Sequence, residues 1–244
     1  MLSIHGLTYS FEKEKAIFQG LTLDVKRGEF VSVIGASGSG KSTLFKLVTG
    51  LIEPNQGDIL IDGEQTGKRL GSVGYMPQKD LLLPWRTVLE NVLLPLEVKK
   101  DRKESKLPEI KEWLARFGLA EYENAYPNEL SGGMKQRVAF LRTLMTGKEL
   151  LLLDEPFGAL DSLTKRNMHK WLLGLWGELQ KTVLFITHDL EEAILLSDRI
   201  YLLQDTGIKE IKVNLQRPRS SQLIYQSEFL TMRKELEWLI HNES

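Results

Sequence analysis

A stretch rich in glycine and serine, residues 35–43, has the spacing of a phosphate-binding loop. It reads GASGSGKST and fits the pattern G-x-x-x-x-G-K-[ST]. Glycines let backbone N–H groups turn toward phosphate oxygens, and the following helix adds a partial positive charge. Lys41 is placed to reach the β- and γ-phosphates of a nucleotide, and Ser42 to bind Mg²⁺ through its hydroxyl. The predicted phosphate-binding residues are Gly35, Ala36, Ser37, Gly38, Ser39, Gly40, Lys41, Ser42 and Thr43. The alternative is a Gly/Ser-rich surface turn.

A pair of carboxylates, Asp154 and Glu155, ends the apolar run Leu150 to Leu153. This placement suits a Mg²⁺-nucleotide site. Asp154 would hold the metal, directly or through water, and Glu155 would orient and polarise the attacking water as general base. Apolar strands that end in an acidic turn are common, so the pair gains this meaning only together with the phosphate-binding loop.

A second helix start of the Ser-Gly-Gly type lies at residues 131–133, ahead of an amphipathic run that continues to Met145. Serine is a good N-cap residue, and the two glycines permit close backbone approach. Such a start is another anion site, although a plain helix cap has the same appearance. The predicted anion-binding residues are Ser131, Gly132 and Gly133.

The elements that must position these residues alternate between strands and helices. Apolar, β-branched runs predict strands at 21–25, 30–34, 57–61, 72–75, 150–153, 182–187 and 199–203. Helical spacing is found at 44–51, 162–179 and 190–197. This alternation predicts an α/β fold with a mostly parallel sheet. Residues 79–148 show only helical patterns and are predicted to form a helical subdomain. It interrupts a core made of residues 1–78 and 149–216, and residues 217–244 form a helical tail.

Composition excludes several classes of function. The chain has 244 residues, a formal net charge of −1 and no cysteine. It therefore has no disulfide framework, no cysteine-ligated metal and no thiol nucleophile, and no overall charge that would attract nucleic acid. The first residues lack the build of a signal peptide, and the apolar runs fall far short of the roughly 20 residues that span a bilayer. We therefore expect a soluble, intracellular chain.

The octapeptide Leu130 to Arg137, LSGGMKQR, resembles the signature motif of the ATP-binding subunits of ABC transporters. The three motifs also occur in the order of that family, and the resemblance covers about Ile4 to Leu203. It implies a P-loop NTPase core with an N-terminal antiparallel β part and the helical insertion, with ATP and Mg²⁺ as cofactors. Met134 and Ala36 depart from the usual Gln and Pro, but neither change removes an essential side-chain group.

The resemblance assigns roles to single residues outside these motifs. Gln78 resembles the Q-loop glutamine that senses Mg²⁺ and the γ-phosphate, and His188 the switch histidine that contacts the γ-phosphate. Asp161 resembles the D-loop aspartate that faces the opposite subunit, and it also suits a helix N-cap. Phe11 resembles the aromatic residue that stacks on adenine, with Tyr9 as the alternative. The expected catalytic residues are thus Glu155, His188 and Gln78, and the expected metal ligands are Ser42, Gln78 and Asp154.

The resemblance also implies partners. Two copies pack head to tail, so that Ser131 and Gly133 of one close on the γ-phosphate held by the other. A separate permease docks near Leu81–Val92, where Trp85 suits a binding hot spot unless it is buried at the start of the subdomain.

Two segments, residues 83–88 (LPWRTV) and 182–189 (TVLFITHD), are most similar in sequence to the ATP-binding subunits of importers of nitrate, sulfonate, taurine and thiamine precursors. That similarity implies ATP-driven uptake of a small, often anionic solute brought by an external binding protein. The chain would then lie peripherally on the cytoplasmic face of the cell membrane. The solute itself is not specified, because selectivity belongs to the other subunits.

Two other classes fit less well. An ABC ATPase that acts in DNA repair or on ribosomes usually carries a long coiled-coil insertion or two tandem ATPase units, and this chain has neither. A P-loop kinase would have no use for a second phosphate-facing helix start such as the one at Ser131.

Overall fold

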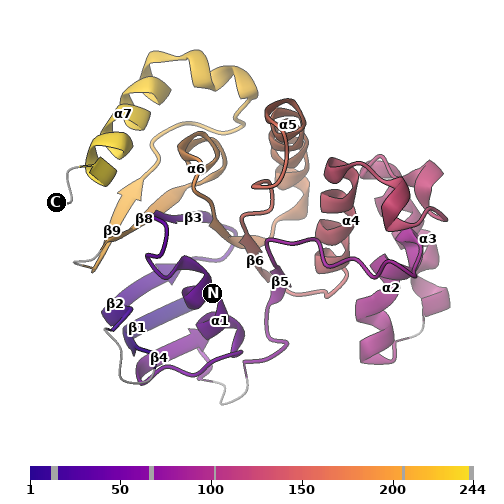
Figure 1. Cartoon of the computed structure of the whole chain (residues 1–244), viewed down its shortest axis with the longest axis horizontal. Helices are drawn as coiled ribbons and strands as arrows, with labels where there is room; N and C mark the ends of the chain where they lie inside the picture. Colours follow the sequence, from indigo (N-terminus) through magenta and orange to yellow (C-terminus); the bar gives the residue numbers. More distant parts are fainter. Residues whose placement is uncertain (12–15, 66–68, 102, 205–206, 242–244) are drawn as a thin grey trace.

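The computed structural model describes residues 1–11, 16–65, 69–101, 103–204 and 207–241, which form two β-sheets with helices around them (Figure 1). The last three residues of the expected tail, 242–244, lie outside the described part. The described strands are β1 Leu2–Tyr9, β2 Phe18–Val25, β3 Phe30–Gly35, β4 Gln56–Ile61, β5 Gly74–Met76, β6 Leu150–Asp154, β7 Thr182–Ile186, β8 Arg199–Gln204 and β9 Gly207–Lys212. The described α-helices are α1 Lys41–Thr49, α2 Val88–Lys99, α3 Lys103–Arg116, α4 Gly132–Leu144, α5 Ser162–Leu179, α6 Leu190–Leu196 and α7 Ser227–His241.

The larger sheet has the order β5-β6-β7-β3-β8-β9, and all of its strands are parallel except β9. Helices cover both of its faces, so the apolar side chains of the inner strands are buried whichever way they point. Leu150 and Leu152 of β6 pack toward α1, whereas Leu151 and Leu153 pack toward α5. Because parallel strands end at one edge, the residues after β3, β5, β6 and β7 meet there.

The smaller sheet, β2-β1-β4, is antiparallel and packs against α1 through one apolar face. Helix α1 ends at Gly50, whose φ of +76° allows its N–H to bond back to the last turn. Leu51 therefore lies beyond the helix and is 56% exposed. Its predicted place on the apolar helix face is wrong. Strand β5 also begins two residues later than predicted, because Ser72 closes a turn with Arg69.

Residues 79–148 contain α2, α3 and α4, which gather at one side of the molecule (Figure 1). Thr87 caps α2 in a capping box with Glu90. The charged α3 still buries Ile110 and Leu114, and Phe117 just beyond it packs at 4.8 Å from the ring of Trp171 on α5. The helical group therefore shares a core with the face of the sheet that α5 covers.

The tail packs on the opposite end of the sheet. Phe229, Leu236 and Leu239 of α7 are buried against α6 and β8. The buried Arg219 donates hydrogen bonds to carbonyl groups that follow or end α6, among them that of Ile194 at 3.1 Å. In the described part of the chain, no helix combines the length and apolar character that crossing a membrane requires.

Candidate functional site

The predicted phosphate-binding loop connects β3 to α1. Lys41 is buried at the first position of the helix, and its Nζ donates to the carbonyl oxygens of Gly35 at 2.9 Å and Ala36 at 2.8 Å. Gly40 caps the helix with a φ of +92°, and a Cβ there would lie 2.5 Å from Cγ2 of Ile17. Both the backbone conformation and the space therefore require glycine. Burial lowers the pKa of Lys41, and the charges of Glu155 and Asp154 act in the opposite direction.

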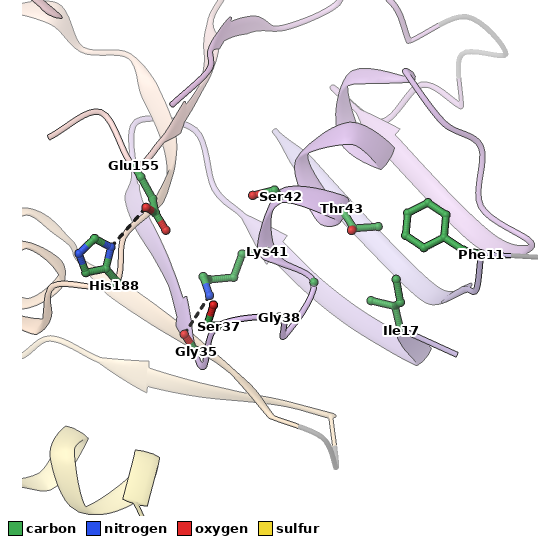
Figure 2. A pocket seen from close by; sticks show the side chains of 11 residues that line it. Phe11, Ile17, Gly35, Ser37, Gly38, Lys41, Ser42, Thr43, Glu155 and His188 are labelled. Carbon is green, nitrogen blue, oxygen red and sulfur yellow. Dashed lines mark hydrogen bonds and ion pairs between the residues drawn. The ribbon is translucent and has the colours of Figure 1, made fainter. Parts of the chain in front are cut away.

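A cavity of about 540 Å³ opens above this loop (Figure 2). Phe11 and Ile17 lie at one end of it, Glu155 and His188 at the other, and Lys41 between them. Its lining residues are Phe11, Ile17, Gly35, Ser37, Gly38, Gly40, Lys41, Ser42, Thr43, Glu155 and His188. Tyr9 is buried beneath Phe11, with the two rings 5.1 Å apart and edge to face. The structure thus places Phe11 at the cavity, and Tyr9 in the core.

Ile17 was not predicted as a site residue, although it lines the same end of the cavity as Phe11. The signal for it is weak, because a single isoleucine ahead of β2 has the same appearance as a strand residue. Only the structure shows that Ile17 borders the cavity. Its side chain lies next to Gly40, where a Cβ would clash with it.

The metal-binding candidate Asp154 is buried at the end of β6. Burial and the neighbouring charge of Glu155 raise its pKa, while hydrogen bonds from Tyr75 and Ser42 and the charge of Lys41 work in the opposite direction. The Tyr75 hydroxyl lies 3.4 Å from Oδ2 of Asp154, and burial together with this carboxylate raises the pKa of Tyr75 to about 12. Tyr75 was not predicted, because its contact depends on the pairing of β5 with β6.

Glu155 is held at the centre of the three expected catalytic residues. Its φ of +43° is rare for a residue with a side chain, and its N–H donates to the carbonyl of Ile186 at 2.9 Å. Its Oε2 accepts a hydrogen bond from Nε2 of Gln78 at 3.0 Å and lies 3.3 Å from Nδ1 of His188. Gln78, which follows β5, and His188, which follows β7, therefore converge on one carboxylate oxygen of Glu155, which follows β6.

The remaining predicted residues lie outside this cavity. Ser131 and Gly132 are exposed at the start of α4, where Oγ of Ser131 accepts from the N–H of Met134 at 3.3 Å. Asp161 caps α5 by accepting from the N–H groups of Leu163 and Thr164, and hydrogen bonding to Thr164 lowers its pKa. The described residues of one chain thus present two helix starts suited to anions, and only the one at Gly40 faces the cavity.

Comparison with known proteins places this arrangement in a family. Residues 18–158 match the family model described as ABC transporter. The chain belongs to the ABC transporter family. It is 43% identical over 250 residues to the formylaminopyrimidine import ATP-binding protein ThiZ of Halalkalibacterium halodurans, covering 100% of this chain and 98% of that protein. It is 41% identical over 225 residues to the aliphatic sulfonates import ATP-binding protein SsuB of Bacillus cereus, covering 90% and 88%. The nitrate import ATP-binding protein NrtD of Synechocystis sp. is 42% identical over 200 residues, covering 81% and 75%.

Solved structures agree with this assignment. The dimeric ATP-binding cassette MJ0796, bound to ADP and Pi, superposes with a TM-score of 0.75 at 34% identity, covering 88% of this chain and 100% of that one. The protein cbiO1 of Clostridium perfringens, part of the ABC transporter complex cbiONQ, has the same fold, with a TM-score of 0.79 at 24% identity and coverage of 96% and 94%. This ABC transporter chain is thus an ATP-binding subunit of the importer type, with the ABC ATPase fold. The reaction it catalyses is ATP hydrolysis coupled to transport.

Proposed function

We propose that this ABC transporter subunit drives uptake of a small anionic or vitamin-precursor-like solute through a separate permease. Two copies would close head to tail around ATP and open after hydrolysis. The named relatives import formylaminopyrimidine, aliphatic sulfonates and nitrate, which supports this class of solute. An external binding protein would deliver the solute, and the subunit would sit on the cytoplasmic face of the membrane.

The observation that carries the proposal is the convergence of Gln78 and His188 on Oε2 of Glu155, at the phosphate end of the cavity. Adenine would stack on Phe11, and the triphosphate would lie along residues 35–43. Lys41 would exchange its two carbonyl partners for β- and γ-phosphate oxygens. Glu155 would take a proton from the attacking water, with its carboxylate held in place by Gln78 and His188.

The residues next to Lys41 also fit Mg²⁺. The Ser42 side chain acts on Asp154 by lowering its pKa, and a hydroxyl and a carboxylate are the hard oxygen donors that this ion prefers. Gln78, at the edge of the same site, would complete the protein's share of the ligands. When bound there, the ion would neutralise phosphate charge.

The second helix start supports the dimer. Ser131 and Gly132 are exposed and do not line the cavity of their own chain, so their anion-binding capacity is available to a partner. A head-to-tail copy would bring them, with Gly133, to the γ-phosphate held by the other chain, and Asp161 to the interface. The related cassette MJ0796 is dimeric, which is consistent with this arrangement.

The permease would dock on the segment 81–92, at the junction of the core and the helical subdomain of residues 79–148. Trp85 is 70% exposed, and Leu81 is also exposed. Hydrogen bonds fix the backbone of this segment. Arg142 donates to the carbonyls of Asp80 and Leu81, and the buried Asn91 bonds to the backbone of Leu83. Exposed apolar groups on a fixed backbone favour a binding surface.

The dimer is tested by light scattering on the Glu155→Gln variant, in which we expect hydrolysis to be blocked and ATP binding to be retained. With Mg²⁺-ATP we expect twice the monomer mass, and with ADP the monomer mass. A strict monomer at saturating ATP would contradict the proposed mechanism.

A further inference from the structure

A buried polar cluster lies next to His188, and none of its members takes part in the proposed hydrolysis. It joins Lys165 and His169 of α5 to Glu192 of α6. Glu192 and His169 are almost completely buried, and Oε1 of Glu192 lies 3.0 Å from Nε2 of His169 and 3.3 Å from Nζ of Lys165. Buried charged groups are costly to keep unless they are paired, so this cluster requires an explanation.

The cluster holds both neighbours of His188. Thr187 donates from Oγ1 to Oε2 of Glu192, and its Oγ1 accepts from the N–H of Asp189 at 3.0 Å. Lys165 also contacts Oδ2 of Asp189 at 3.3 Å. The residues immediately before and after His188 are thereby tied to α5 and α6, whereas the imidazole itself remains exposed.

The same cluster reaches the turn that carries Glu155. His169 packs edge to face on Phe157 with the rings 5.3 Å apart, and Phe157 lies two residues after Glu155. Lys165 and His169 are four residues apart, so they share one face of α5. A single helix face therefore supports both the histidine loop and the carboxylate turn.

The carboxylates around Lys165 stabilise its charged form. Burial disfavours the charged form of Lys165, but the carboxylates of Glu192 and Asp189 outweigh it and raise the pKa of this lysine. Lys165 is therefore a fixed cation between two carboxylates. Removing its charge leaves the buried Glu192 with less compensation, so its hydrogen bonds to Thr187 and His169 rearrange.

We propose that Lys165, His169 and Glu192 are positioning residues that hold His188 at its distance from Glu155. The inference rests on the proposed role of His188 in hydrolysis. The three residues touch no nucleotide in this scheme. They act through the backbone on either side of His188, so their loss should affect the catalytic step rather than ATP binding.

The test is a double-mutant cycle on ATP hydrolysis by the full chain. Lys165→Met should lower kcat about tenfold or more while KM for ATP changes less than about threefold, since small misplacements of catalytic groups have effects of this size. In a His188→Ala background, Lys165→Met should have almost no further effect. Lys165→Arg should restore most of the rate. Lys170→Met, the same change at an exposed position of α5, is the matched control and should leave kcat unchanged.

The outcomes separate the two proposals. If His188→Ala alone leaves kcat at the wild-type value, the proposed role of His188 is wrong. If His188→Ala impairs hydrolysis but Lys165→Met either leaves kcat unchanged or lowers it equally in both backgrounds, the positioning role is wrong and the cluster only stabilises the fold. Should Lys165→Met fail to fold by circular dichroism, Lys165→Gln serves in the same cycle, because glutamine removes the positive charge but remains polar beside Glu192.

Discussion

Gln78 donates a hydrogen bond from Nε2 to Oε2 of Glu155 at 3.0 Å, although the two residues are 77 positions apart in the chain. The contact arises because they follow the neighbouring parallel strands β5 and β6, in which Met76 pairs with Leu153. Gln78 also begins the segment that leads to the exposed Trp85. Movement of that segment would therefore change the support of the proposed general base, which would connect the proposed permease surface to hydrolysis.

The two aromatic residues near the proposed adenine end of the cavity should respond differently to truncation. Phe11 is 43% exposed and lines the cavity, so Phe11→Ala should weaken ATP binding about fivefold or more, with little loss of stability. Tyr9 is 8% exposed within the core, so Tyr9→Ala should instead reduce the free energy of unfolding by about 3 kcal/mol. Calorimetric ATP titration and urea unfolding measure the two effects. Equal loss of ATP affinity in both variants would count against Phe11 as the stacking residue.

Replacing Asp154 should stabilise the nucleotide-free protein while abolishing its activity. Burial and Glu155 raise the pKa of Asp154 above its ordinary value of 3.8, so the folded state binds this proton more tightly than the unfolded chain does. Ionisation of the group therefore costs stability as the pH rises above that value. Asp154→Asn removes this cost and retains an acceptor for Tyr75, so we expect its Tm at pH 7 to rise by about 2–4 °C.

The pH dependence gives the control for this variant. The difference in Tm between Asp154→Asn and the wild type should narrow as the pH falls toward 4, because Asp154 takes up its proton first in the folded state and then, near its ordinary pKa of 3.8, in the unfolded chain. Hydrolysis with Mg²⁺ should be lost at every pH. A variant that is less stable than the wild type at pH 7 would show that the carboxylate stabilises the fold.

Truncation of Trp85 should weaken assembly with the permease but leave the stability and activity of the isolated chain unchanged. Because its side chain is 70% exposed, Trp85→Ala should change the free energy of unfolding by less than about 0.5 kcal/mol and leave ATP hydrolysis by the isolated chain unchanged. Recovery of the subunit with its permease from membranes should fall about tenfold or more. Trp238→Ala, at another exposed tryptophan on α7, is the control. Equal recovery of the two variants would place the permease surface elsewhere.

Complementation can show that Ser131 serves the nucleotide of the other chain. Ser131→Asp keeps a good N-cap for α4 but puts a negative charge where the γ-phosphate would lie, and Ser131→Asn caps the helix without charge. Ser131→Asp and Lys41→Ala should each be inactive. Their equimolar mixture should regain about a quarter of the wild-type rate, because half of the dimers contain one intact composite site. A mixture that stays inactive would contradict the head-to-tail arrangement.

The parts of the site that the sequence predicts best are those whose spacing the chemistry itself dictates. The loop at residues 35–43 and the pair Asp154-Glu155 lie where the pattern places them, on β3–α1 and at the end of β6. Helix α5 also has its predicted bounds, Ser162–Leu179, because Asp161 caps its first turn. Local chemistry determines these features, so a single sequence is sufficient to predict them.

Features that depend on which strands become neighbours could not be predicted. The contacts of Tyr75 with Asp154 and of Lys165 with Glu192 require the strand order β5-β6-β7 and the packing of α5 on α6. Strand β9, GIKEIK, was not predicted because an edge strand carries charges where an inner strand is apolar. Leu51 was misassigned because the helical periodicity continues through it, although Gly50, a residue type that commonly ends helices, directly precedes it.

We propose that Glu155 activates the attacking water, and the rate of phosphate release by Glu155→Gln decides whether it does. Glutamine keeps the shape of the side chain but cannot accept the proton, so we expect the rate to fall about 100-fold or more, with ATP affinity within about threefold of the wild type. Glu149→Gln is the same substitution at the residue that directly precedes β6, and it should retain the wild-type rate. Undiminished phosphate release by Glu155→Gln would contradict the proposed mechanism.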